Sequence, residues 1–148
     1  MIETYRSVNQ TVLIALDGTD YFSSSAIHCP QCSTREHAKG QVRDSHPALT
    51  PVVVKPGVDK VIPLAPEFIR PQDGAEKQDC ELNAAKRWLA DGGDDYSPLG
   101  VTRLGDDRYG HEPFCRAVLN QGMNFILVCK PTSHPLTSPF KVIKKVIV

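Results

Sequence analysis

Short apolar runs separated by polar turns dominate the pattern along the chain. Residues 11–16 form a continuous apolar run that ends in Asp17-Gly18-Thr19, and residues 124–129 form a similar run. A short run without alternation is typical of a strand buried on both faces. We therefore predict a strand at each position, with Asp17 held at the C-terminal end of the first.

In the middle of the chain, the spacing of the hydrophobic residues changes from a strand pattern to a helix pattern twice. Residues 49–55 and 60–64 are rich in β-branched side chains and are separated by Pro56-Gly57, which favours a β-hairpin. Residues 76–90 follow a helical period that ends at Asp91-Gly92-Gly93. Residues 101–105 then predict a short strand, and residues 112–121 predict a second helix.

The predicted order is strand, insertion, strand, strand, helix, strand, helix, strand. The insertion covers residues 23–46, whose serines, cysteines, histidines and scattered charges indicate a loop or small knuckle without a core of its own. Three antiparallel strands followed by two β-α-β crossovers is the order of the ribonuclease H-like fold. The expected fold class is therefore α/β, a mixed sheet with flanking helices and a Cys/His-containing insertion after the first strand.

Composition and charge narrow the classes of function. The 148 residues include 17 Lys and Arg against 17 Asp and Glu, so any DNA binding depends on local patches of charge. No apolar stretch approaches the roughly 18–20 residues of a membrane span, and residues 1–6 have no secretory signal pattern. Five cysteines in such a chain indicate a reducing compartment, and we expect a cytoplasmic protein without membrane contact.

Carboxylates follow two of the predicted strands. Asp17 ends the first strand, and Asp106-Asp107 follow the strand at residues 101–105. If these strands are neighbours, Asp17 and Asp106 project from the same edge of the sheet and could share a Mg²⁺ ion, which prefers oxygen ligands. Asp20 and Asp73 could compete for this role. Taken singly, Asp17 fits a turn residue and Asp106 fits a helix N-cap equally well.

The insertion contains a second candidate metal site. Cys29 and Cys32 have the Cys-x-x-Cys spacing of zinc ligands, and His28, His37 and His46 could supply further ligands. Thiolate and imidazole ligands favour Zn²⁺ over Mg²⁺. Cys29, Cys32 and His46, with one other ligand, could therefore hold Zn²⁺ apart from the carboxylates, the alternative being a surface turn with two free thiols.

Several motifs, in this order, resemble the transposases of bacterial insertion sequences. They are residues 13–22 (LIALDGTDYF), 27–32 (IHCPQC), 66–74 (PEFIRPQDG), 76–81 (EKQDCE), 104–109 (LGDDRY) and 124–130 (NFILVCK). The resemblance spans residues 10–135 and points to the DDE class, named after its three catalytic carboxylates. It is the order of several motifs, rather than any single aspartate, that makes the resemblance specific.

The resemblance implies a ribonuclease H-like core that binds two Mg²⁺ or Mn²⁺ ions through two Asp and one Glu. Such an enzyme cleaves double-stranded DNA at transposon ends and joins the freed 3′-hydroxyl to target DNA, and a homodimer would be compatible with this. By motif, Asp17 matches the first catalytic Asp. Asp106 matches the second, at the start of an Asp-x-x-Tyr pattern, with Asp107 as the fallback. Arg108 and Tyr109 would lie near the DNA or brace the site.

The chain also departs from the family pattern. The catalytic Glu belongs on a helix well beyond residues 124–130, and no Glu follows Glu112. We therefore expect residues 1–135 to be a partial catalytic domain and residues 136–148 to be a tail, foreign to the domain or frameshifted. On this view the chain is a truncated transposase without strand-transfer activity.

Two alternatives remain open from the sequence. One is a non-catalytic zinc-knuckle module that binds nucleic acid or a protein. The other is a different ribonuclease H-like nuclease, complete at this length. The nuclease needs a further acidic ligand, for which Glu67, Glu76 and Glu81 are the candidates.

Overall fold

The computed structural model describes residues 2–7, 9–37, 40–70, 79–128 and 130, a mixed α/β structure with two sheets and two α-helices. In chain order the elements are η1 (Ile2–Tyr5), β1 (Val12–Ala15), β2 (Gly18–Ser24), β3 (Ser33–His37), β4 (Gln41–Leu49), β5 (Val52–Val54), β6 (Ile62–Pro63), β7 (Glu67–Phe68), α1 (Glu81–Tyr96), η2 (Ser97–Leu99), β8 (Val101–Gly105), η3 (Asp107–Tyr109), α2 (Glu112–Asn120) and β9 (Asn124–Leu127). The predicted tail at 136–148 and Glu76 lie outside the described residues.

The larger sheet has the strand order β6-β5-β1-β8-β9. β5 pairs antiparallel with β1 and with β6, as the predicted hairpin requires. β8 pairs parallel with β1, and β9 parallel with β8. The strand at residues 101–105 therefore lies beside the first strand, which is the condition for Asp17 and Asp106 to share one edge of the sheet.

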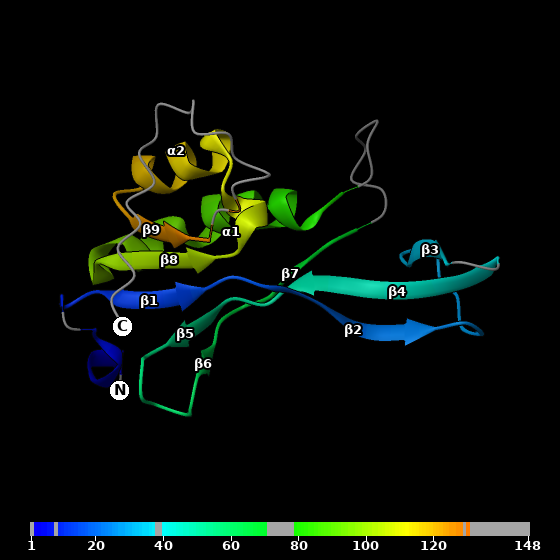
Figure 1. Ribbon diagram of the computed structural model, residues 1–148, viewed down its shortest axis with the longest axis horizontal. Helices are drawn as coiled ribbons and strands as arrows, with labels where there is room; N and C mark the ends of the chain where they lie inside the picture. Colours follow the sequence, from blue (N-terminus) through cyan, green and yellow to red (C-terminus); the bar gives the residue numbers. More distant parts are fainter. Residues whose placement is uncertain (1, 8, 38–39, 71–78, 129, 131–148) are drawn as a thin grey trace.

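The second sheet is a ribbon with the order β2-β4-β3, and β7 also pairs with β4. β1 runs on into β2, and β4 runs on into β5, so the two sheets share one long antiparallel pair. The backbone N–H of Thr50 donates to the carbonyl oxygen of Asp17 at 2.8 Å and continues that pairing between the sheets. Figure 1 shows the ribbon extending sideways from the sheet and its helices.

The prediction of a loop or knuckle at residues 23–46 is wrong in its secondary structure, because β3 and most of β4 lie there. The segment is polar because a ribbon is held by hydrogen bonds between backbones and needs little apolar burial. The expectation that it lacks a core of its own agrees with the structure. The buried apolar cluster takes its members from other segments: Val12, Ile14, Leu16, Leu49, Val53, Ala84, Ala85, Trp88, Leu89, Val101, Tyr109, Phe114, Val118 and Met123.

Burial of the strands differs from the prediction. In β1, Val12 and Ile14 are fully buried while Leu13 and Ala15 are half-buried. In β9, Asn124 and Ile126 are exposed, so burial on both faces is wrong there. β9 is buried on one face only because it is the last strand of its sheet in the described part of the chain, and its other face does not meet the core.

Both ends of the first predicted helix are corrected. Cys80 is the extended N-cap, so α1 begins at Glu81, and it continues past both glycines to Tyr96. Gly93 lies under the Gln121 side chain, whose Oε1 would be 1.6 Å from a β-carbon there. The Gln121 amide donates to the carbonyl oxygen of Leu89 at 2.8 Å. Gly93 therefore permits close packing of the chain after α2 on α1 and does not end the helix.

Arg103 of β8 is an ionisable residue inside the apolar cluster and is fully buried. Its guanidinium lies 4.3 Å from the ring centroid of Trp88 and 5.7 Å from that of Tyr96. One Nη atom donates to the Met123 sulfur at 3.3 Å, while Nε and the other Nη have no hydrogen-bond partner among the described residues. Burial lowers the pKa of Arg103 to about 10. The cation is held by aromatic faces and not by a carboxylate.

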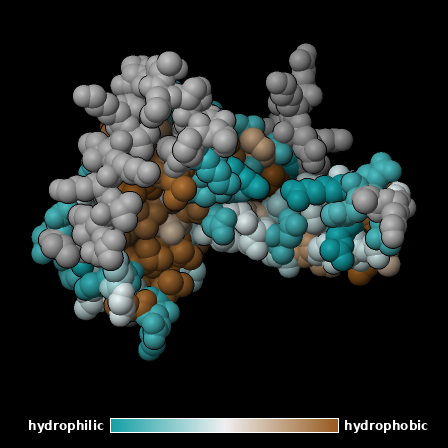
Figure 2. All heavy atoms as spheres, viewed as in Figure 1, coloured by the Kyte–Doolittle hydropathy of each residue, from teal (hydrophilic) through white to brown (hydrophobic). Residues whose placement is uncertain are grey.

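Among the described residues, no helix is long and apolar enough to cross a lipid bilayer. Figure 2 shows a mainly hydrophilic ribbon, whereas hydrophobic surface gathers on the lobe that contains the larger sheet.

Candidate functional site

Asp17 and Asp106 follow neighbouring parallel strands at the same edge of the larger sheet. Ala15 of β1 is opposite Leu104 of β8, and each aspartate comes two residues later. The N–H of Leu16 donates to the carbonyl oxygen of Leu104 at 2.9 Å, so the pairing extends almost to the two carboxylates. Both aspartates are exposed. The structure thus brings together the two residues that the sequence singled out for Mg²⁺.

The two carboxylates of the Asp106-Asp107 pair have different surroundings. Asp106 is the N-cap of η3, and its Oδ1 accepts a hydrogen bond from the N–H of Arg108 at 2.9 Å. Asp107 Oδ1 accepts from the N–H of Lys130 at 2.6 Å and ties the chain after β9 to η3. Asp107 therefore has a structural role, and Asp106 is the better candidate for a cation ligand.

Glu81, the first residue of α1, lies beside this edge. Its Oε1 accepts a hydrogen bond from the Tyr109 hydroxyl at 2.5 Å, and its Oε2 accepts from Arg108 Nη1 at 2.9 Å. It also packs on the backbone of Gly18, next to Asp17. Of the two candidates for a third ligand that the structure describes, Glu81 lies here, whereas Glu67 is paired with Arg87 at 2.7 Å.

The Tyr109 hydroxyl lies within the electrostatic reach of all three carboxylates. Its side chain is buried, and burial is the main reason that its pKa is raised above the ordinary value. The hydrogen bond to Glu81 and the negative charges of Glu81, Asp106 and Asp17 raise it further. Tyr109 therefore stays protonated and donates to Glu81. The expectation that Arg108 and Tyr109 brace the site agrees with their contacts to Glu81.

An ion-pair network fixes the start of α1 and hence Glu81. Asp79 is buried and accepts hydrogen bonds from Arg87 at 3.0 and 2.8 Å and from the N–H groups of Arg70 and Cys80. Burial opposes ionisation of Asp79, but these hydrogen bonds and the Arg87 charge outweigh it and lower its pKa. The same interactions, with Glu67 as a second partner, raise the pKa of Arg87.

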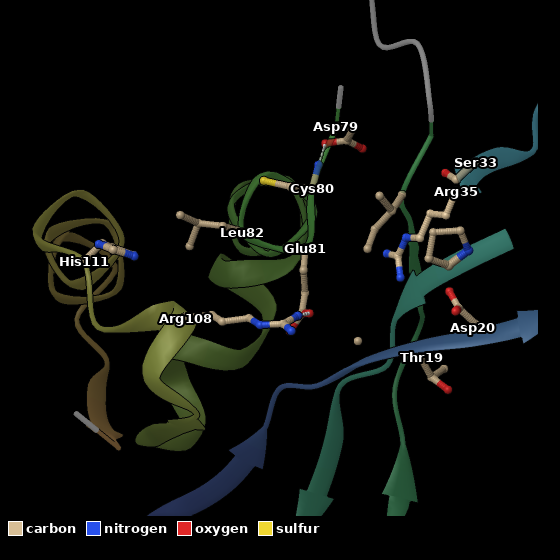
Figure 3. Close-up of a pocket in the computed structure, with 13 residues that line it drawn as sticks. Thr19, Asp20, Ser33, Arg35, Asp79, Cys80, Glu81, Leu82, Arg108 and His111 are labelled. Carbon is tan, nitrogen blue, oxygen red and sulfur yellow. Dashed lines mark hydrogen bonds and ion pairs between the residues drawn. The ribbon is translucent and has the colours of Figure 1, made fainter. Parts of the chain in front are cut away.

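A cleft of about 600 Å³ opens between the ribbon and the start of α1. Figure 3 shows Glu81 and Arg108 pointing toward each other on one side, and Arg35 reaching in from the ribbon on the other. Asp20 also lines the cleft, as does His111, which precedes α2. The cleft reaches Gly18 and Arg108, which are close in the chain to Asp17 and Asp106, but neither of these two aspartates lines it.

Cys29, Cys32 and His46 form a second cluster, at the ribbon. The Cys29 and Cys32 sulfurs lie 3.4 Å apart, and they lie 3.3 and 3.4 Å respectively from Nε2 of His46. Two local features shape the turn: the Cys32 N–H donates to the Cys29 carbonyl oxygen, and the Cys29 N–H donates to the Cys32 sulfur. β4 supplies His46. The three ligand atoms could hold a metal ion such as zinc.

The remaining histidines of this region are placed differently. His28 Nδ1 lies 3.2 Å from Oδ1 of Asp44, which also accepts a hydrogen bond from the Thr34 hydroxyl at 2.6 Å. The Thr34 bond is the largest cause that lowers the pKa of Asp44. His37 ends β3 and lines a hollow with Arg43 and Gln41. Of the three candidate histidines, His46 is thus the one that joins the cysteines.

The two clusters differ in how closely their ligands gather. Among the residues that the structure describes, Cys29, Cys32 and His46 are the one group of three potential metal ligands whose atoms all lie within 4.8 Å of one another. Asp17, Asp106 and Glu81 are not gathered as closely. The Cys-x-x-Cys spacing is local and can be recognised in the sequence. His46 and Glu81 are each one of three candidates that the sequence offers, and only the fold places them.

The chain matches no family model, no curated protein and no solved structure. Its function is therefore argued from the site.

Proposed function

We propose that the chain is part of a DNA transposase whose Asp17 and Asp106 hold divalent cations for phosphoryl transfer. The observation that carries the proposal is the placement of these two carboxylates after neighbouring parallel strands, at the same edge of the sheet. The strand order β6-β5-β1-β8-β9, with β8 and β9 parallel to β1, supports the ribonuclease H-like fold that the motifs imply.

The residues present fit a hard divalent cation. Asp17 and Asp106 offer exposed carboxylate oxygens, and in the described part of the chain neither is paired with a lysine or arginine. When bound, Mg²⁺ or Mn²⁺ would neutralise charge on the phosphate and activate the attacking oxygen. The protein would hold the carboxylates on rigid strand ends, while Arg108 and Tyr109 orient Glu81 beside them.

Manganese binding is the direct test. We expect Mn²⁺ to bind the wild-type chain, as measured by its electron paramagnetic resonance signal. Asp17→Asn and Asp106→Asn should each lower the Mn²⁺ affinity at least about tenfold or abolish binding. Asp107→Asn is the matched control and should bind as the wild type does. Equal Mn²⁺ affinity in the wild type and Asp17→Asn would overturn the proposal.

Assays of DNA joining and DNA nicking distinguish the proposed transposase from the alternative nuclease. If no catalytic Glu joins Asp17 and Asp106, the chain should bind cations and still join no DNA ends. A complete nuclease would nick DNA in Mn²⁺, and Glu81 is its best-placed third carboxylate because it packs beside Gly18. Mn²⁺-dependent nicking that is abolished by Asp17→Asn, Asp106→Asn and Glu81→Gln would favour the nuclease. Nicking that survives all three would exclude both enzymes.

We also propose that Cys29, Cys32 and His46 hold zinc as a structural ion. With zinc–sulfur bonds of about 2.3 Å and zinc–nitrogen bonds of about 2.0–2.1 Å, ligand atoms of a tetrahedral site lie about 3.5–3.8 Å apart. The 3.3–3.4 Å separations of this cluster are close to that. The ion would tie the turn before β3 to β4 and stiffen the ribbon.

Metal content tests this second site separately. We expect one zinc per chain in the wild type and in Asp17→Asn, and a loss in Cys29→Ser and His46→Ala. Cys115→Ser, which removes a buried thiol on α2, is the control. Absence of zinc from the wild type after reconstitution would exclude the site. Stoichiometric zinc without a Mn²⁺ site would favour the zinc-knuckle module over the transposase.

A further inference from the structure

The ribbon has two chemically different faces. Side chains alternate between the faces along each strand, and directly opposed residues on neighbouring strands share a face. The β3–β4 register therefore places on one face Ser33, Arg35 and His37 of β3 and Gln41, Arg43 and Ser45 of β4. The other face carries Thr34, Glu36, Asp44 and His46, and His46 belongs to the cluster that it forms with Cys29 and Cys32. We call the first of these the arginine face.

Two arginines oppose each other directly on the arginine face. Arg35 is the register partner of Arg43, and both side chains are exposed. In the described residues neither guanidinium has an ion pair or a side-chain hydrogen bond, whereas four other arginines pair with carboxylates, namely Arg6, Arg87, Arg108 and Arg116. Like charges opposed across strands are unfavourable. An anion bound between Arg35 and Arg43 would offset the repulsion between their charges.

Carboxylates of β3 and β4 lie on the opposite face. Glu36 is the register partner of Val42, and Asp44 is the partner of Thr34, to which it is hydrogen-bonded. Asp44 also lies 3.2 Å from His28. On β3 and β4 the positive side chains lie with serine and glutamine on one face, and the acids lie on the other. Asp20 of β2, opposite Pro47, is an acid on the arginine face and lines the cleft with Arg35. A polyanion is the partner that the charge separation on β3 and β4 fits.

The arginine face leads to the carboxylate edge. Arg35 lines the cleft together with Gly18, Glu81 and Arg108 (Figure 3). Arg43 lines a hollow farther out on the ribbon, with Ser25 and His37. We propose that the arginine face binds the phosphate backbone of DNA and directs it along the cleft toward Asp17 and Asp106. This inference rests on the proposed function for its substrate.

Binding of a fluorescent DNA duplex, without divalent cations and at low salt, tests the inference. We expect Arg35→Ala/Arg43→Ala to weaken binding at least about tenfold and to reduce the slope of log affinity against log salt by about 2, one for each lost phosphate contact. Lys86→Ala/Arg116→Ala removes the same charge from α1 and α2 and should have a smaller effect. Arg35→Lys/Arg43→Lys should restore most of the salt slope.

The outcomes separate this inference from the proposed function. A double alanine variant that binds duplex with the wild-type affinity and slope overturns the inference, as does a wild-type chain that binds no duplex. Circular dichroism melting and zinc content of the variant show that its ribbon is intact. Mn²⁺ binding of Arg35→Ala/Arg43→Ala should equal that of the wild type. If Mn²⁺ binding is absent while the arginines are required for DNA, the catalytic proposal fails and this one stands.

Discussion

Gly18 and Glu81 are in direct contact: a β-carbon on Gly18 would lie 2.5 Å from Oε2 of Glu81 and 2.7 Å from its carboxyl carbon. The two residues come from β2 and from the first position of α1. Because Gly18 follows Asp17, this contact sets how closely the Glu81 carboxylate approaches the sheet edge. Gly18 leaves the space that the Glu81 carboxylate occupies, and its backbone angle is not in the left-handed region.

Gly18→Ala is predicted to move the Glu81 carboxylate and to break its hydrogen bonds to Tyr109 and Arg108. The buried Tyr109 hydroxyl would lose its partner, so we expect the free energy of unfolding to fall by about 1–3 kcal/mol. Urea denaturation measures it. Gly92→Ala, within α1, is the comparison variant. Its β-carbon would lie 3.3 Å from the Tyr96 ring, so the helix-propensity gain is offset and the change should stay within about 1 kcal/mol of zero. A Gly18→Ala protein as stable as the wild type would mean that Glu81 is not held here.

Tyr109→Phe is predicted to remove the same hydrogen bond from its other end. Tyr109 is 1% exposed, and the loss should cost about 1–3 kcal/mol, because Glu81 then keeps only Arg108 as a side-chain partner. The double variant Gly18→Ala/Tyr109→Phe gives a sharper measurement. Its destabilisation should be clearly less than the sum of the two single effects, since both remove one interaction. Full additivity would contradict the proposed link.

Asp79 is predicted to make stability depend on acid pH. Its pKa is lowered in the folded state, so its contribution is complete above the unfolded value of about 4 and is lost as the pH falls through the folded value. The difference in unfolding free energy between the wild type and Asp79→Asn should therefore be large at pH 7 and should shrink toward pH 3. Asp95→Asn, an exposed site on α1, should show no such change. A difference that is constant with pH would contradict the prediction.

Arg103→Met is predicted to raise the thermal midpoint. The substitution removes a fully buried cation with two unpartnered nitrogens and keeps a long apolar chain against Trp88 and Met123. Replacing buried charge by a well-packed apolar side chain is often stabilising, here by about 1–2 kcal/mol. Arg103→Lys should be destabilising, because an ammonium lacks the planar group that stacks on the indole. Calorimetry of both variants checks the prediction, and a lower midpoint for Arg103→Met would refute it.

Local pattern was enough to locate most of the core elements. The apolar runs that became β1 and β8, the hairpin of β5 and β6, and the helix α2 were predicted from periodicity and turn residues. The failures have separate causes. β3 and β4 were missed because a ribbon needs few apolar residues, and the end of α1 was missed because Gly93 accommodates Gln121 from a distant part of the chain.

The sequence by itself determined which residues are candidates for chemistry: carboxylates at strand ends, and a cysteine pair at zinc-ligand spacing. Only the tertiary structure decided which of them meet. Parallel pairing of β1 with β8 brings Asp17 beside Asp106, the ribbon pairing brings His46 to the cysteines, and the position of α1 brings Glu81 to Gly18. These contacts join residues far apart in the chain, so they depend on strand register and helix packing, which no local pattern specifies.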